Sequence, residues 1–168
     1  IHKKALVPRI NEISREIRKF EPDLEKTGQN REYTLFISKN AASFFAKASA
    51  GICTSQDTEL FKRSDHFHMN MVEDNRLVRA NIQAFIINLD EGRALLLRGF
   101  NPNVDFEREI DPKSFCDGVL EIARKFASEN ALSGVYITSN EWGWHALSNR
   151  SSISSYLVSK YNKEPAAR

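Results

Sequence analysis

The chain has 168 residues, of which 41% are apolar and 27% are charged, a composition typical of a globular domain and unlike that of a disordered chain. Its 24 basic and 22 acidic side chains leave a net charge of +2, which provides no strong field for nucleic acid or a membrane surface. No apolar run approaches the ~20 residues that a membrane span requires. We expect residues 1–168 to form one domain, and because the chain begins at Ile1 we expect it to come from a longer protein.

The chain contains two cysteines, Cys53 and Cys116. Cys116 falls on the apolar face of a predicted helix, so we expect no disulfide between them. A reducing, cytoplasmic compartment is the simpler interpretation of this cysteine usage.

The first third of the chain predicts two helices separated by a strand. Apolar residues recur at helical spacing over residues 10–20. Residues 33–37 are rich in β-branched and aromatic side chains, which favours a strand. The second helix, capped at Ser38 or Asn40, ends at Gly51.

Three strands are predicted in the middle of the chain. Residues 66–72 alternate between apolar and polar side chains. After a turn at residues 73–75, residues 78–88 alternate in the same way. A second turn at residues 89–92 leads into residues 94–97, an apolar run typical of a central strand buried on both faces. Because both turns are short, we expect an antiparallel meander.

The remaining sequence predicts a crossover helix, a further strand and a last helix. Asp111 is a suitable N-cap, Pro112 fits the first helical position, and a wide apolar stripe continues to about Asn130. Residues 134–138 form the next strand, which a right-handed crossover makes parallel to the strand before the helix. The last helix occupies residues 149–161. We therefore expect an α/β (α+β) fold in which helices cover both faces of one mixed sheet.

The segment that leaves the central strand has features of a ligand-binding turn. It reads Leu97-Arg98-Gly99-Phe100-Asn101-Pro102-Asn103. Gly99 permits a ligand to approach the main chain closely, and Arg98 offers a positive charge. The N-terminus of the following helix favours phosphate groups. Carboxylates in the intervening loop would repel such groups unless they point away; these are Asp105, Glu107, Glu109 and Asp111.

A second candidate segment lies on the last helix. Asn149 and Tyr156 are seven residues apart, or two helical turns, so both can face the same groove. A tyrosine hydroxyl can act as a general acid there. The alternative is that Tyr156 is a core aromatic residue and Asn149 is a helix N-cap.

The order of elements and these two segments resemble the GNAT superfamily of acyl-CoA-dependent N-acyltransferases. The resemblance covers about residues 66–161 and concerns element order more than identity. In that family the last meander strand and the strand after the crossover helix diverge, and the pantetheine arm lies between them. Arg98 stands at the first position of the family's pyrophosphate motif, whose second glycine is missing here. The resemblance implies that Tyr156 protonates the departing thiolate, and that acetyl-CoA or another acyl-CoA is bound by Leu97, Arg98, Gly99, Phe100, Asn101, Asn103 and Asn149.

A base for the amine acceptor could come from the first meander strand. His66 and His68 project to the same side of that strand, so they could act together as a base or an acceptor contact. A third protein ligand at diagnostic spacing is absent from the sequence, so we expect no metal. The alternative is that both histidines lie on the solvent-facing side of an edge strand.

Two functions of other classes stay open. The missing glycine and the acidic loop favour a non-catalytic interaction module on the same fold. A cysteine-dependent hydrolase or acyltransferase would use Cys53 with His145 and Asn149, although the position of Cys53 at a helix C-terminus would raise its pKa.

Overall fold

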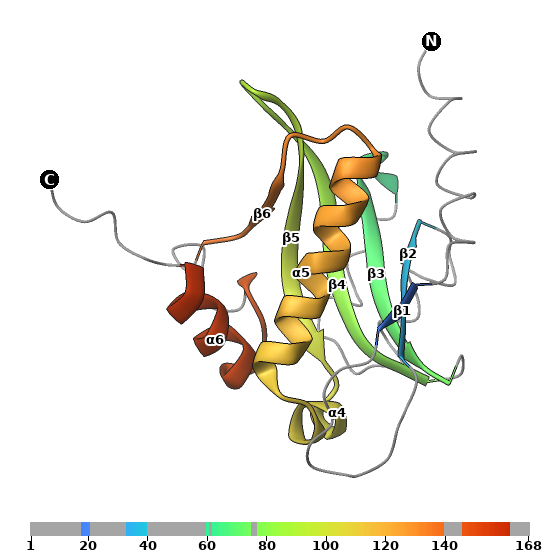
Figure 1. The fold of residues 1–168 in the computed structure, drawn as a ribbon, viewed down its shortest axis with the longest axis vertical. Helices are drawn as coiled ribbons and strands as arrows, with labels where there is room; N and C mark the ends of the chain where they lie inside the picture. The colour runs from blue at the N-terminus through green and yellow to red at the C-terminus, as the bar shows by residue number, and fades with distance from the viewer. Residues whose placement is uncertain are drawn as a thin grey trace, which may run out of the picture.

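The computed structural model describes residues 18–20, 33–39, 60, 62–74, 77–139 and 146–161. These residues form a six-stranded sheet in the order β1-β2-β3-β4-β5-β6, with helices α4, α5 and α6 beside it (Figure 1). The elements are β1 (Arg18–Phe20), β2 (Tyr33–Ser38), β3 (His66–Glu73), β4 (Leu77–Leu89), β5 (Gly92–Pro102), α4 (Val104–Glu109), α5 (Pro112–Glu129), β6 (Val135–Ile137) and α6 (Ser151–Tyr161). Strands β1 to β5 pair antiparallel, and β6 pairs parallel with β5. The predicted mixed sheet is confirmed.

Helix α5 covers one face of the sheet (Figure 1). Its N-cap is Asp111, whose side chain accepts a hydrogen bond from the Ser114 amide at 2.8 Å, and Pro112 occupies its first turn, as predicted. The helix buries its apolar stripe, including Cys116, in the main hydrophobic core. On the sheet side, Phe67 packs against Phe126 with ring centroids 5.6 Å apart. The alternating apolar residues of β3 and β4 therefore face α5, as their periodicity predicts.

The start of the described chain differs from the prediction. Arg18–Phe20, expected at the end of a helix, is a strand that pairs antiparallel with Tyr33–Leu35 of β2. Helical spacing of apolar residues is a weak local preference, and pairing with a neighbouring strand overrides it here. The rest of that predicted helix, and nearly all of the second one, lie outside the described residues. The same applies to the expected helical cover of the other sheet face.

The segment between β5 and α5 also differs from the predicted loop. Strand β5 continues to Pro102, and residues 104–109 form the short helix α4. The Asn103 side chain caps this helix by accepting a hydrogen bond from the Phe106 amide at 2.8 Å. Phe106 is fully buried and packs against Tyr33, with ring centroids 5.1 Å apart. Burial of this one aromatic side chain gives the acidic segment a reason to be helical, since it anchors α4 to the core.

No helix within the described ranges is long and apolar enough to cross a membrane.

Candidate functional site

Strands β5 and β6 diverge after a short parallel pairing. They pair from Leu95–Val135 to Leu97–Ile137, and the Thr138 amide makes a further hydrogen bond to the Leu97 carbonyl at 3.2 Å. Beyond this point β5 continues beside β4, while the chain that follows β6 leads away from β5 (Figure 1). The divergence predicted near Arg98 is therefore present.

A β-bulge lies on β5 at the divergence. The register with β4 shifts between the Asn81–Asn101 and Gln83–Arg98 pairs, so that Gly99 and the residue after it oppose one residue of β4. Gly99 has a φ of +65°, a conformation that L side chains rarely adopt. A Cβ atom at this position would also lie 3.1 Å from the side-chain nitrogen Nδ2 of Asn101. The glycine is thus required by the bulge itself, whether or not a ligand approaches it.

The edge of β5 beyond the bulge is occupied by another part of the chain. The Phe100 amide donates to the Leu147 carbonyl at 2.7 Å, and the Ser148 hydroxyl donates to the Phe100 carbonyl at 2.6 Å. The Asn149 amide donates to the Asn101 side-chain oxygen at 2.8 Å. The segment from Leu147 to Asn149 is therefore hydrogen-bonded to β5 at Phe100 and Asn101. We had predicted that Phe100, Asn101 and Asn149 contact a cofactor. The space between the strands is partly filled by the protein.

The other residues of the predicted cofactor segment have distinct surroundings. Leu97 is fully buried in the core. Asn103 caps α4. Arg98 is exposed at the divergence and lies directly across from Gln83 on β4. Arg98 is therefore the member of this segment whose charged group faces solvent.

The acidic segment between β5 and α5, residues 105–111, lies close to the start of α6. Glu107 accepts a hydrogen bond from Ser152 at 2.7 Å and pairs with Arg150 at 3.5 Å. Asp111, by contrast, caps the N-terminus of α5, which was the expected site for a pyrophosphate. The Glu107 carboxylate is thus paired with the positive charge of Arg150. The Asp111 carboxylate occupies the N-terminus of α5, where a phosphate group was expected to bind.

Tyr156 lies at the contact between α5 and α6. Its hydroxyl donates a hydrogen bond to the Asp117 carboxylate at 2.7 Å, and the Lys160 amine lies 3.0 Å from that hydroxyl and also pairs with Asp117. Partial burial raises the pKa of Tyr156 above its ordinary value, and the hydrogen bond to Asp117 acts in the same direction. The hydroxyl is therefore protonated at neutral pH, and it points at α5 in this structure. Asp117 was not identified from the sequence, because it lies 39 residues before Tyr156 on another helix. Lys160 lies four residues after Tyr156 on the same helix, so helical spacing could have identified it.

His66 and His68 are both buried, with 2% of each residue exposed, so the alternative interpretation, in which they lie on the solvent-facing side of an edge strand, is wrong. Strand β3 is flanked by β2 and β4, which makes it an interior strand. The rings meet edge to face with centroids 4.6 Å apart, and the Asn81 amide lies 3.0 Å from Nδ1 of His68. They lie on the sheet face opposite Phe67, and hence opposite α5. The structure does not bring them together with Tyr156.

The described residues contain no group of three or more His, Cys, Asp or Glu side chains that could hold a metal ion. Cys116 is a buried free thiol, and burial raises its pKa, which makes it unreactive. Cys53 and His145 lie outside the described residues.

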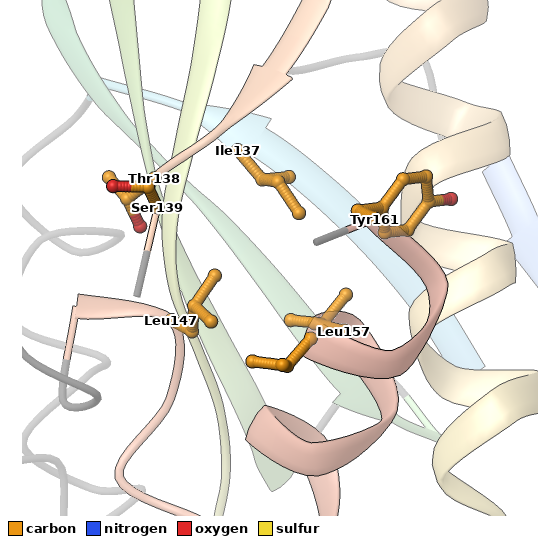
Figure 2. A pocket seen from close by; sticks show the side chains of 7 residues that line it. Ile137, Thr138, Ser139, Leu147, Leu157 and Tyr161 are labelled. Atoms are coloured by element: carbon orange, nitrogen blue, oxygen red, sulfur yellow. The ribbon is translucent and has the colours of Figure 1, made fainter. Parts of the chain in front are cut away.

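A pocket of about 140 Å³ opens where β6 ends, between the divergence and α6. Figure 2 shows Ile137, Leu147 and Leu157 turned toward this space, with Tyr161 at one side and Thr138 and Ser139 at the other. Val158 also contributes to its lining. This pocket was not predicted, but two features of the sequence could have indicated it. The apolar face of α6 was predicted, and two hydroxyl residues follow directly after the β6 strand.

No protein-family model matches the sequence, and no curated protein matches it. Among solved structures, the fold is similar to that of a candidate acetyl transferase from Pyrococcus furiosus, with a TM-score of 0.50 and 10% sequence identity. The similar region covers 81% of this chain and 97% of the Pyrococcus protein. At this identity the likeness concerns the fold alone, and the described sheet and helices are consistent with a GNAT-like fold.

Proposed function

We propose that this chain transfers an acyl group from an acyl-CoA thioester to an amine. The observation that supports this most directly is the pocket at the divergence of β5 and β6, in a fold similar to that of a candidate acetyl transferase. Two parallel strands that separate expose main-chain groups and side chains to a ligand that enters between them. In an open α/β sheet such a place is a common location for a binding site.

The proposed reaction needs few groups from the protein. The amine attacks the thioester carbonyl, a C–N bond forms, and the C–S bond breaks. The thiolate leaves with the electron pair, and the amine nitrogen gives up a proton to a base or to solvent. Tyr156 is our proposed proton donor to that thiolate, since its hydroxyl is protonated at neutral pH and it lies on α6, the helix that lines the pocket. To act there, the hydroxyl must exchange its hydrogen bond to Asp117 for one to the sulfur. Arg98, exposed at the divergence, is our proposed contact for the cofactor's phosphates.

The predicted role of the two histidines depends on where the amine acceptor binds. A base function for His66 or His68 requires the amine to reach the buried polar face of β3, opposite α5. The acceptor itself can be a protein amine or a small amine. Neither a histidine base nor a particular amine acceptor is needed for the thioester to bind.

A non-catalytic interaction module is the second candidate, and one observation favours it. The Leu147–Asn149 segment uses hydrogen-bonding groups of β5 that a pantetheine arm would otherwise contact. Asp111 likewise occupies the helix end that would receive a pyrophosphate. A domain that has lost its cofactor could retain this filled arrangement.

Calorimetric titration with acetyl-CoA, CoA and 3′,5′-ADP distinguishes the two candidates. Saturable binding is expected for the transferase, and Arg98→Ala should weaken all three ligands, because each contains the phosphates. Arg93→Ala is the matched control, since Arg93 is an exposed arginine at the opposite end of the same strand. If none of the three ligands binds to the folded wild-type protein, acyl transfer is refuted and the module is favoured.

A further inference from the structure

The walls of the pocket at the strand divergence are mainly aliphatic. Ile137 comes from β6, Leu147 from the segment beside β5, and Leu157 and Val158 from α6 (Figure 2). Leu147 and Leu157 are almost completely buried, whereas Tyr161 at the side is 38% exposed. Aliphatic side chains therefore form the inner wall of the pocket, Thr138 and Ser139 lie at one side of it, and it is open to solvent beside α6. Such a site binds ligands by removing apolar surface from water.

Most polar groups around the pocket already have partners. The Thr138 amide donates to the Leu97 carbonyl, and its hydroxyl donates to the Ala146 carbonyl at 3.0 Å. The Tyr161 hydroxyl accepts a hydrogen bond from Arg124 at 3.4 Å. Among the described residues that line this pocket, none carries a carboxylate, amine or guanidinium group. The pantetheine arm contains two amides, and burying these without partners is unfavourable. A hydrocarbon chain needs no such partners.

The size of the pocket bounds the length of that chain. An apolar protein cavity of about 150 Å³ holds one benzene molecule, which has six carbon atoms. A pocket of about 140 Å³ is therefore close to the size of a six-carbon group. An acetyl group contributes two carbons and would leave most of the space unfilled. Unfilled apolar space forgoes contact energy that a longer chain would gain.

From the volume and the apolar lining, we propose that this pocket receives the acyl chain of the thioester, and that the preferred acyl group is an aliphatic chain of about four to six carbons rather than acetyl. This inference rests on the proposed acyl transfer and specifies its substrate class. Val158 and Leu157 on α6 then determine chain length, because their side chains line the space that the terminal carbons occupy.

A chain-length series tests the inference. Affinity is measured by calorimetry for acetyl-, butyryl- and hexanoyl-CoA with the wild-type protein. Full burial of one methylene group corresponds to about a fourfold change in affinity. Because the pocket is open on one side, we expect a gain of about twofold to fourfold per methylene up to hexanoyl.

Substitutions at neighbouring positions provide the control. Val158→Phe should abolish the gain in affinity of hexanoyl-CoA over acetyl-CoA, because the larger ring fills the pocket. Ser159→Phe adds the same ring at the next, exposed position of α6 and should leave the series unchanged. Val158→Ala gives a second test if the phenylalanine variant folds poorly, since a wider pocket should favour the longest chain further.

The possible failures are distinct. Equal affinity for all three thioesters, or a Val158→Phe effect that is the same for every chain length, overturns the acyl-chain inference and leaves acyl transfer intact. Absence of binding by every thioester overturns the proposed function, and the substrate class with it.

Discussion

Helix α6 forms one wall of the pocket, and three side chains fix it to α5. The Tyr156 hydroxyl donates to the Asp117 carboxylate at 2.7 Å, and the Lys160 amine contacts both groups. We predict that Tyr156→Phe destabilises the protein by about 1 kcal/mol. A hydrogen bond to a charged acceptor contributes roughly 1.5–3 kcal/mol when buried, and partial exposure of this cluster reduces that value. For a domain of this size, the change corresponds to a decrease in Tm of about 2–4 °C.

A double-mutant cycle isolates this interaction. Urea unfolding is measured for the wild type, Tyr156→Phe, Asp117→Asn and the double variant. Because both substitutions remove parts of one contact, the double variant should be more stable than the sum of the two losses implies, by about 0.5–1 kcal/mol. Tyr161→Phe is the control, since the hydroxyl of Tyr161 lies 3.4 Å from its arginine partner and should contribute little. Additive losses for Tyr156 and Asp117 would refute the proposed attachment of α6.

The same variants separate two roles of Tyr156 once an acceptor is known. If the hydroxyl is the proton donor, Tyr156→Phe should lower kcat by about 10²-fold or more, with little change in cofactor affinity. Asp117→Asn retains the hydroxyl and should reduce kcat much less. Equal reductions in the two variants would assign Tyr156 a positioning role only.

Three further predictions follow from single groups. Burial acts to raise the pKa of Asp117, but hydrogen bonds from Lys160 and Tyr156 outweigh burial and hold the pKa below its usual value. The stability that the ionised Asp117 contributes is therefore present above its unfolded pKa of about 3.9 and is lost as the pH falls through the lower folded pKa. The urea midpoints of the wild type and Asp117→Asn should therefore converge as the pH falls below about 4. Gln83 is 2% exposed, and within the described part of the chain neither atom of its side-chain amide has a hydrogen-bond partner. Because a buried unpaired group costs about 1–3 kcal/mol, Gln83→Leu should raise the urea midpoint. A lower midpoint would mean that the side-chain amide is hydrogen-bonded. Asp111→Ala removes the cap of α5 and should cost about 1 kcal/mol in chemical unfolding, whereas Asp111→Asn, which can still cap, should cost less.

Apart from α4, the regular elements from β3 to α6 were predictable because each depends on residues close together in the sequence. Alternation identifies β3 and β4, and the Asp111–Pro112 pair identifies the start of α5. The parallel pairing of β5 and β6 followed from the handedness of the crossover helix between them. Helix α4 was missed because its one buried side chain, Phe106, finds its partners on distant elements.

The candidate site shows the same division. The sequence determined the position of Arg98 after the last apolar residues of β5, and the presence of Tyr156 on the last helix. Only the tertiary structure decided that the Tyr156 hydroxyl donates a hydrogen bond to Asp117, and that the Leu147 carbonyl accepts one from the Phe100 amide. Local patterns fix which elements form, since they act through neighbouring residues. Which polar groups meet across the fold depends on packing between segments about 40 or more residues apart, and that packing set the size and apolar character of the pocket.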